Sequence, residues 1–181
     1  MIEVKKKNFF FNEEVDTCLQ SIITNKSFAN GYIFSGAEGL GKKKTALQFI
    51  NSIFTKSSPS ESIEEKIINN NHPDLLIIEP SSLIENKRSK NSNLENKSKD
   101  GSEIIKIGQI RKIKTFLGQK SINSDKKIVL IIDAHLLNEA ASNCLLKTLE
   151  EPNNGTFILL TSRLNLLLDT ITSRCQIIRF R

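Results

Sequence analysis

The sequence predicts an α/β fold in which helices flank a five-stranded, mostly parallel sheet. Short apolar runs alternate along the chain with stretches whose apolar residues recur at helical spacing, and this alternation indicates right-handed β-α-β crossovers. The segment KIVLIIDAH at residues 127–135 contains a continuous apolar run, as expected of a central parallel strand that is covered on both faces. With 181 residues, the chain is long enough for one domain with a proper core.

The first half of the chain is expected to contain two helices and two strands. Apolar residues within 13–23 lie on one face of a helix, and GYIFS at 31–35 is a short buried strand that runs into a glycine-rich loop. A helix over about 42–54 follows and ends at the breaker sequence SSPSES. The segment HPDLLIIEP at 72–80 is a second strand, opened and closed by prolines.

Residues 81–103 interrupt this alternation. They are rich in serine, asparagine and lysine and contain almost no apolar residues. Such a composition cannot bury enough surface to offset the entropy lost when a chain becomes ordered. We therefore expect a mobile insertion, to which the sequence assigns no role.

The second half of the chain continues the pattern of strands and helices. The helix over 138–151 has the clearest limits, because Asn138 is a favourable N-cap residue and Pro152 stops it. The expected helices cover 106–120, 138–151 and, in a shorter form, 164–174. The expected strands cover 127–135, 156–161 and 176–180.

Charge and cysteine content restrict the possible partners of the protein and the compartment in which it is expected. The net charge of +6 allows contact with nucleic acid, but a lysine-rich proteome explains it equally well. One tyrosine and no tryptophan provide no evident platform for stacking single-stranded bases. Cys18, Cys144 and Cys175 are far apart, which fits reduced thiols in a cytoplasmic protein better than disulfides or a zinc site. No apolar run approaches a membrane span, so no membrane contact is expected.

The segment GAEGLGKKKT at 36–45 fits the phosphate-binding pattern G-x-x-x-x-G-K with Gly36, Gly41 and Lys42, and Gly39 adds flexibility. The glycines allow backbone N–H groups to surround phosphate oxygens, while the lysine and the helix N-terminus add positive charge. Three consecutive lysines are unfavourable at that end of a helix, and a bound anion would reverse the penalty. We therefore expect affinity for ATP or another phosphate ligand, with a turn that binds nothing as the alternative.

Two positions argue against ATP hydrolysis. Lys43 stands where such loops carry the serine or threonine that coordinates Mg²⁺, and an ammonium cannot ligate a cation. Asp133 ends a buried strand, where it could reach a magnesium-bound water, but Ala134 follows it where an active enzyme has a glutamate base. Thr45 and His135 are poor substitutes by position. Intrinsic ATPase activity is therefore not expected.

The later part of the chain resembles a known family. DAHLLNEAASNCLLKTLEEP at 133–152, followed by FILLTSRLNLLLDTITSRCQIIRF at 157–180, resembles the AAA+ module of bacterial clamp loaders, and the lysine in the glycine loop resembles the delta-prime family of DNA polymerase III. The resemblance implies a RecA-like P-loop NTPase fold. It covers only the first of the family's three domains, so residues 1–181 are expected to form the nucleotide-binding-type domain without the lid and carboxyl-terminal collar domains.

The resemblance also implies roles for single residues. With the glycine loop included, the nucleotide-binding candidates are Gly36, Gly39, Gly41, Lys42, Lys43, Asp133 as the Walker B carboxylate and Thr161 as the first sensor. Arg174 in the SRC segment matches the arginine finger, which in this family reaches into the ATP site of the neighbouring subunit. A cation that caps the preceding helix is the alternative for Arg174.

The sequence departs from the family in a feature that concerns metals. Many members carry four cysteines between the first helix and the HPD strand, where they bind a structural zinc ion. Here that region, FTKSSPSESIEEKIINNNHPD, contains no cysteine. Zinc is therefore not expected, and His72 is expected to be a strand-entry residue rather than a ligand.

Two functions are compatible with the resemblance. The first is a non-motor subunit of the replicative clamp loader, which helps the DNA polymerase III holoenzyme, a DNA-directed DNA polymerase, to load its sliding clamp on primed DNA. Its implied partners are the motor (tau/gamma) and delta subunits. The second is an active ATPase motor of the tau/gamma type, which would be expected to carry a hydroxyl at position 43 and a glutamate at position 134. An unrelated P-loop protein, such as a small kinase, leaves the LLKTLEEP and SRC segments unexplained.

Overall fold

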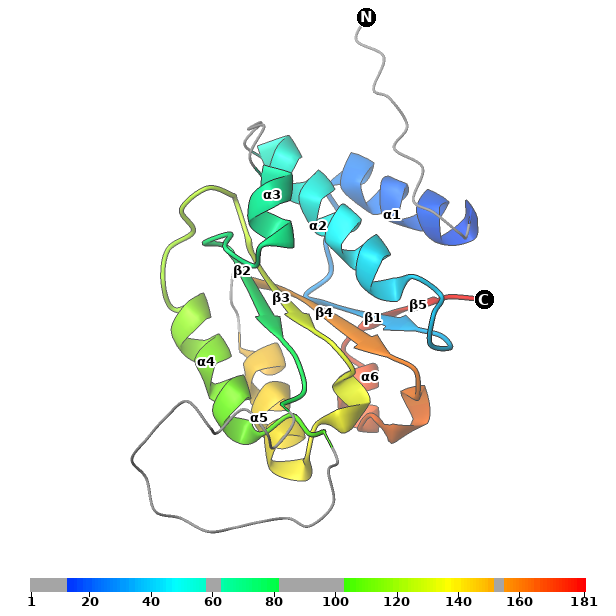
Figure 1. The fold of residues 1–181 in the computed structure, drawn as a ribbon, viewed down its shortest axis with the longest axis vertical. Helices are drawn as coiled ribbons and strands as arrows, with labels where there is room; N and C mark the ends of the chain where they lie inside the picture. Colours follow the sequence, from blue (N-terminus) through cyan, green and yellow to red (C-terminus); the bar gives the residue numbers. More distant parts are fainter. Residues whose placement is uncertain (1–12, 58–62, 82–102, 152–154) are drawn as a thin grey trace, which may run out of the picture.

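The computed structural model describes residues 13–57, 63–81, 103–151 and 155–181. Its strands form a five-stranded sheet in the order β2-β3-β4-β1-β5, in which every neighbouring pair runs parallel (Figure 1). The predicted parallel sheet is therefore confirmed. The strands are β1 (Gly31–Ser35), β2 (Leu75–Ile78), β3 (Lys127–Ile131), β4 (Gly155–Thr161) and β5 (Gln176–Arg179).

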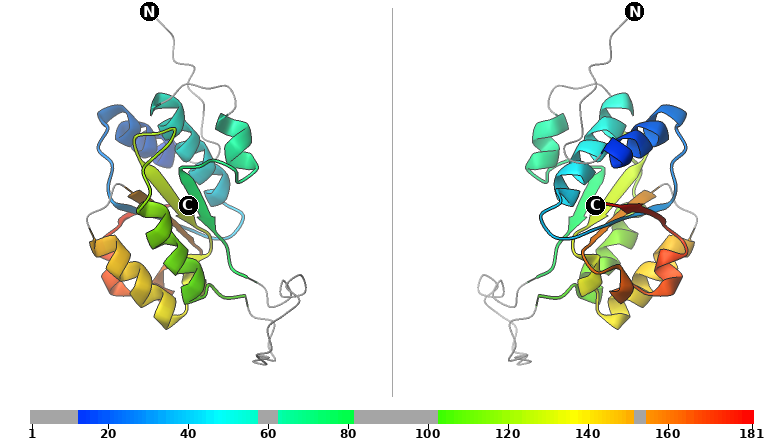
Figure 2. Two further views of the ribbon diagram at one scale, coloured as in Figure 1. Left: turned by 90° about the vertical axis from the view of Figure 1, so that its left-hand side faces the viewer. Right: turned by 90° about the vertical axis from the view of Figure 1, so that its right-hand side faces the viewer.

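Helices cover both faces of the sheet (Figures 1 and 2). One face carries α1, α2 and α3, and the other carries α4, α5 and α6. The helices are α1 (Glu13–Asn25), α2 (Lys42–Ser57), α3 (Ile63–Ile68), α4 (Ile107–Leu117), α5 (Glu139–Glu150) and α6 (Asp169–Thr172), with two short 3-10 turns, η2 (Ala134–Leu136) and η3 (Leu164–Leu166).

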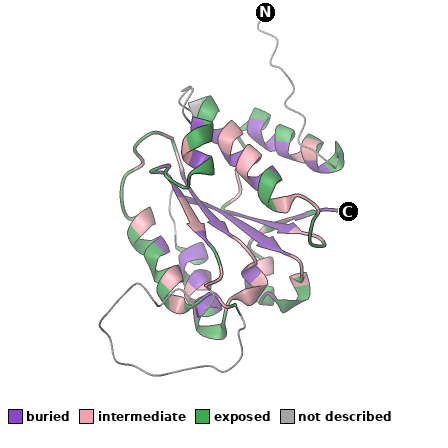
Figure 3. Cartoon of the chain, viewed as in Figure 1, coloured by how far each residue is buried: buried purple, intermediate pink, exposed green. Residues whose placement is uncertain are grey.

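The central strands are buried on both sides (Figure 3). Successive side chains of a strand point to opposite faces, so Tyr32 and Phe34 enter the hydrophobic cluster under α1 and α2, whereas Ile33 enters the cluster under α5. Every residue of β3 and of β4 is buried. This arrangement explains why the sequence of β3 is apolar without alternation.

The structure departs from the expected elements at three points. β3 ends at Ile131, earlier than expected, and Asp133 adopts a left-handed backbone conformation with φ of 50° at the start of η2. The helix expected over 164–174 is divided into η3 and α6. The sequence analysis did not predict α3, which buries Ile63 and Ile67, because six residues are too few to show helical periodicity.

The predicted insertion at residues 81–103 lies outside the described residues except at its two ends. Ser81 and Ile104 form an isolated antiparallel bridge, and the backbone N–H of Ser81 donates to the carbonyl of Ile104 over 3.2 Å. The two described ends of this segment therefore lie side by side.

His72 lies at the entry to β2 and is only 4% exposed. Its ring stacks on that of Phe54, with centroids 4.2 Å apart and planes 9° from parallel. Its Nδ1 atom accepts a hydrogen bond from the backbone N–H of Asp74 over 3.2 Å. Because Nδ1 is the acceptor, the neutral imidazole carries its proton on Nε2.

Asp74 connects the start of β2 to the segment between α4 and β3. Its side chain is fully buried. It accepts hydrogen bonds from the backbone N–H groups of Ile122 (2.9 Å) and Asn123 (2.7 Å) and from the hydroxyl of Ser124 (3.0 Å). A carboxylate that accepts three hydrogen bonds is well compensated for its burial.

We expect the free energy of unfolding to fall as the pH drops below about 6.5, the ordinary pKa of histidine. Burial lowers the pKa of His72, against the opposing charge of Asp74. The folded chain then binds fewer protons than the unfolded chain, so stability is lost from the unfolded pKa downwards until the folded pKa is reached. The slope is at most about 1.4 kcal/mol per pH unit for this group. Urea unfolding at pH 7.5 and 5.5 measures the effect.

His135, the second histidine of the sequence, provides a comparison. Its pKa is also lowered, chiefly by burial, so it contributes in the same direction. His72→Gln and His135→Gln should each remove part of the pH dependence, and the double variant should remove more than either alone. An unchanged dependence in His72→Gln would contradict the assignment.

Candidate functional site

The carboxyl ends of β1, β3 and β4 lie at the same edge of the sheet, and a cleft of about 600 Å³ opens there. Ligands of open parallel sheets bind in such crevices outside the carboxyl ends of the strands. The walls are formed by the glycine loop, the first turn of α2 and the ends of β3 and β4. The predicted nucleotide-binding residues that line the cleft are Gly39, Gly41, Lys42, Lys43 and Asp133.

The glycines of the loop are each required by the backbone. Gly39 and Gly41 have φ values of 81° and 73°, in the left-handed region that side chains rarely adopt. Gly36 has a different reason, because a Cβ atom there would lie 2.6 Å from the carbonyl oxygen of Phe180, just after β5. The backbone angles and the close approach to Phe180 therefore explain the three glycines, whether or not a ligand binds.

Lys42 is turned back onto the loop that precedes it. Its Nζ donates hydrogen bonds to the carbonyls of Gly36 (2.6 Å) and Ala37 (2.5 Å). Burial lowers the pKa of Lys42, whereas the charges of Asp133 and Glu38 raise it. The ammonium therefore stabilises the loop in this arrangement and faces the carboxylate at the end of β3.

Lys43 forms an ion pair within the chain. Its Nζ lies 2.8 Å from Oε1 of Glu79, just after β2, and both side chains are 55% exposed. The carbonyl of Glu79 in turn accepts a hydrogen bond from the side chain of Gln109 in α4. Thr45, the nearest hydroxyl along the helix, is buried. The structure thus supplies acceptors for Lys42 and Lys43 that the sequence argument for a bound anion had not considered.

The side chain of Thr161, at the end of β4, is occupied by neighbours of its own chain. It is fully buried. Its Oγ1 lies 3.3 Å from Nδ1 of His135 and accepts a hydrogen bond from the backbone N–H of Arg163 over 3.0 Å. Ala134 is also fully buried. The contact with His135, which joins the ends of β3 and β4, is a feature that the sequence analysis missed.

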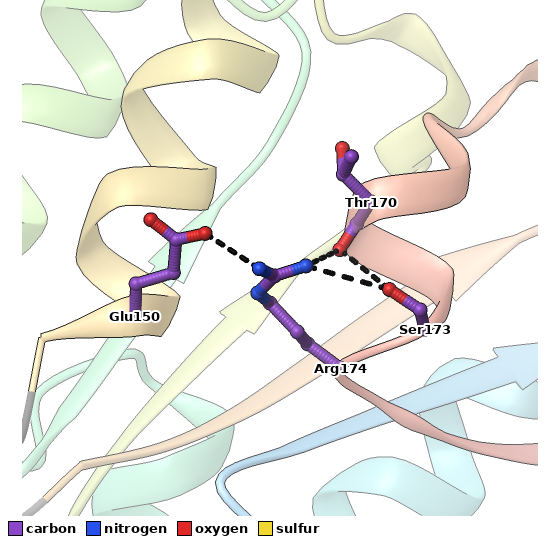
Figure 4. Close-up of polar contacts among 4 residues, drawn as sticks. All are labelled: Glu150, Thr170, Ser173 and Arg174. Atoms are coloured by element: carbon purple, nitrogen blue, oxygen red, sulfur yellow. Dashed lines mark hydrogen bonds and ion pairs between the residues drawn. The ribbon is translucent and has the colours of Figure 1, made fainter.

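Arg174 lies away from the cleft, just after α6 on the other face of the sheet (Figures 1 and 4). Its Nη1 donates to the carbonyl of Thr170 over 2.9 Å, and its Nη2 lies 2.7 Å from Oε1 of Glu150. The arginine side chain is 41% exposed. The structure therefore does not bring Arg174 together with the glycine loop of its own chain, and the contact with Thr170 is that of the helix-capping cation named above as the alternative.

Glu150 is a second residue that the sequence analysis missed. It is the last residue of α5, and its only local signal is its place in the LEEP sequence that precedes the loop to β4. Nothing in that sequence indicates that its partner lies 24 positions further along the chain, because the pairing depends on the packing of α5 beside α6.

Comparison with known proteins relates this geometry to a family. A family model described as "DNA polymerase III, delta subunit" matches residues 11–181. The chain belongs to this family. It is 32% identical over 169 residues to DNA polymerase III subunit delta' of Bacillus subtilis (strain 168), and the match covers 90% of the chain and 45% of that protein. The resemblance to the delta-prime family is therefore confirmed.

Further relatives place the delta-prime-like domain among DNA polymerase III subunits. It is 29% identical over 176 residues to subunit tau of Bacillus subtilis (strain 168), which covers 93% of the chain and 28% of that protein. The crystal structure of a gamma subunit-related protein from Thermotoga maritima superposes with a TM-score of 0.60 at 23% identity and covers 90% of this chain and 45% of that one. This likeness concerns the fold, and it agrees with the predicted P-loop architecture. The chain spans less than half the length of each of these relatives.

Within the described ranges, no group of three or more His, Cys, Asp or Glu side chains is placed to hold a metal ion. None of the described helices is long and apolar enough to cross a membrane.

A cavity of about 770 Å³ lies at the opposite edge of the sheet, and Lys114, Lys127 and Glu151 are among its lining residues. That cavity contains none of the predicted site residues.

Proposed function

We propose that this chain is a non-motor subunit of the replicative clamp loader and presents Arg174 to the ATP site of a neighbouring motor subunit. The observation that carries the proposal is the position of Arg174, which is 41% exposed and lies outside the cleft of its own chain. An arginine in such a place can serve another subunit, where it would neutralise charge that develops on the phosphates.

The residues of the cleft support the same proposal. Lys43 is paired with Glu79 where a hydroxyl ligand for Mg²⁺ would be needed. Ala134 is buried and has no group that could activate water. The left-handed glycines and Lys42 keep the shape of a phosphate-binding loop. We infer that the cleft retains affinity for a phosphate ligand such as ATP and does not hydrolyse it.

The proposal includes the partners that the family resemblance implies. The chain would assemble with the motor (tau/gamma) and delta subunits in the cytoplasm, and would act on the sliding clamp and on primed DNA through the assembled complex. The names of the relatives, which are DNA polymerase III subunits delta' and tau, support this assignment.

An active motor of the tau/gamma type is the second candidate. The observation in its favour is the 29% identity to subunit tau over 176 residues. The same two positions, Lys43 and Ala134, weigh against it, because each lacks the functional group that metal-assisted hydrolysis requires.

A turnover assay distinguishes the two candidates. We expect the purified chain with Mg·ATP to release phosphate no faster than its Lys42→Ala variant, because neither a metal ligand nor a base is present at positions 43 and 134. Lys42→Ala controls for contaminating ATPases. Turnover that depends on Lys42 would establish the motor assignment.

Nucleotide titrations of the same samples test the binding part of the proposal. If the loop holds phosphate without a metal ligand, the affinity for ATP should be the same with Mg²⁺ and with a chelator. An affinity that requires Mg²⁺ would show that the cleft coordinates the metal despite Lys43.

A further inference from the structure

The guanidinium of Arg174 is held from two sides within its own chain (Figure 4). On one side, Nη1 donates to the carbonyl of Thr170 in α6 and lies 3.4 Å from the hydroxyl oxygen of Ser173. On the other side, Nη2 contacts the carboxylate of Glu150 at the end of α5, 2.7 Å away. Both terminal nitrogens of the guanidinium are therefore already bonded.

The position of Glu150 at the end of α5 favours a cation beside it. It is the last residue of α5, and a carboxylate is unfavourable at that end of a helix because the backbone carbonyls make it negative. Glu151, the next residue, is in the same situation and pairs with Lys114 of α4 at 3.1 Å. Each of the two carboxylates thus has a cation from another element beside it, and Arg174 is the one beside Glu150.

We propose that Glu150 and the carbonyl of Thr170 hold Arg174 in a resting position, which the guanidinium leaves before it binds phosphate oxygens of a neighbouring subunit. This inference rests on the proposed function of Arg174 and adds a positioning residue that regulates it. Arginine binds phosphate through two parallel N–H groups. In the resting position Nη1 donates to Thr170 and Nη2 is paired with Glu150, so a phosphate that binds both terminal nitrogens must replace the carboxylate at Nη2.

The ion pair that holds Arg174 in the resting position is weak enough to be broken by a competing anion. The side chains of Glu150 and Arg174 are 47% and 41% exposed, so water and salt screen their attraction. Exposed ion pairs change an equilibrium by about fivefold at most. The polyphosphate of a nucleotide carries more negative charge than one carboxylate and presents several oxygens, so it displaces Glu150 once it comes within reach. Glu150 therefore biases Arg174 towards its own chain by up to about fivefold, and a neighbour that holds nucleotide reverses this bias.

The matched pair of variants Glu150→Gln and Glu151→Gln tests this inference in the full chain assembled with its motor subunits. Both variants remove one negative charge at adjacent positions of the same helix end, but Glu150 is paired with Arg174 at 2.7 Å, whereas Glu151 is paired with Lys114 at 3.1 Å. DNA-stimulated ATP hydrolysis is measured as the concentration of the chain is raised. We expect Glu150→Gln to lower the concentration for half-maximal stimulation by about two- to fivefold, with the maximal rate unchanged, and Glu151→Gln to change neither.

Several outcomes would overturn the inference. A lower maximal rate in Glu150→Gln would mean that Glu150 aligns the bound guanidinium instead of competing for it. Equal shifts in the two variants would indicate a general effect of charge. A shift that persists when Glu150→Gln is combined with Arg174→Ala would indicate a structural role for Glu150, because the partner is then absent.

An NMR measurement on the free chain tests the resting position separately from the proposed function of Arg174. In the free chain, the side-chain N–H signals of Arg174 in NMR spectra report whether rotation of the guanidinium is restricted. We expect restricted rotation in the wild-type chain and in Glu151→Gln, and faster rotation in Glu150→Gln. Identical spectra for all three would exclude the resting position whatever the neighbour does. If the spectra differ as expected while Arg174→Ala leaves hydrolysis by the assembly unchanged, the ion pair exists, the finger assignment is wrong, and the competition with phosphate is overturned with it.

Discussion

Arg174→Ala is expected to remove nearly all of the DNA-stimulated ATP hydrolysis that comes from the one site of the assembled clamp loader that Arg174 faces. Arginine fingers contribute about 10³–10⁵ to the rate where they act on GTP. Only the ATP site that Arg174 faces would lose this charge, so the loss for a whole assembly is smaller than the loss at that site. Steady-state hydrolysis with primed DNA, at saturating concentrations of all subunits, measures the effect.

The fold should survive this substitution, so the loss of rate can be assigned to chemistry. The side chain of Arg174 is 41% exposed and its ion pair with Glu150 is open to water, so removal should change the free energy of unfolding by less than about 1 kcal/mol. Arg174→Lys keeps the charge without the planar fork and should recover only part of the rate. Arg179→Ala removes an exposed cation from β5 and should be silent. Unchanged hydrolysis by Arg174→Ala would exclude the finger.

Asp74→Ala is expected to destabilise the domain by about 3 kcal/mol. The substitution removes one buried carboxylate and three hydrogen bonds at once, and hydrogen bonds to charged groups contribute about 1.5–3 kcal/mol each when buried. The estimate lies below their sum because the two backbone N–H groups are partly buried and can be reached by water. For a domain of this length the melting temperature should fall by roughly 6–12 °C.

Asp125→Ala provides the control for this prediction. Asp125 lies in the same segment between α4 and β3 but is exposed, so its loss should change the melting temperature little. Thermal unfolding followed by circular dichroism compares the two variants with the wild-type chain. Similar melting temperatures for Asp74→Ala and the wild-type chain would show that the three hydrogen bonds contribute nothing net.

Local signals predicted the elements of the fold well, since each depends on residues close together in the sequence. The start of α5 is an example: Asn138 was expected to cap the helix, and its Oδ1 accepts the backbone N–H of Ala141 over 2.8 Å. The apolar run of β3 likewise indicated burial on both faces, which the helix layers provide. Where few residues carried the signal, as in α3, the prediction failed.

Local sequence patterns could not predict the contacts of the candidate site. The ion-pair partners of Lys43 and Arg174, and the three groups that donate to the carboxylate of Asp74, lie 24 to 50 positions away in the sequence, and only the folded chain brings them together. The three lysines after the glycine loop predict affinity for an anion, with a turn that binds nothing as the alternative, and the structure provides Glu79 for Lys43 and backbone carbonyls for Lys42. The charges of Lys42 and Lys43 are therefore compensated within the chain before any anion binds.

The bridge between Ser81 and Ile104 has a consequence for how the protein can change over time. Because the two residues are neighbours, the segment between them starts and ends at adjacent positions, and its length enters only through the entropy of loop closure. Lengthening such a stretch twofold costs only about 0.6 kcal/mol of closure entropy. Longer insertions between Ser81 and Ile104, such as a fluorescent or affinity tag, are therefore expected to cost little in closure entropy.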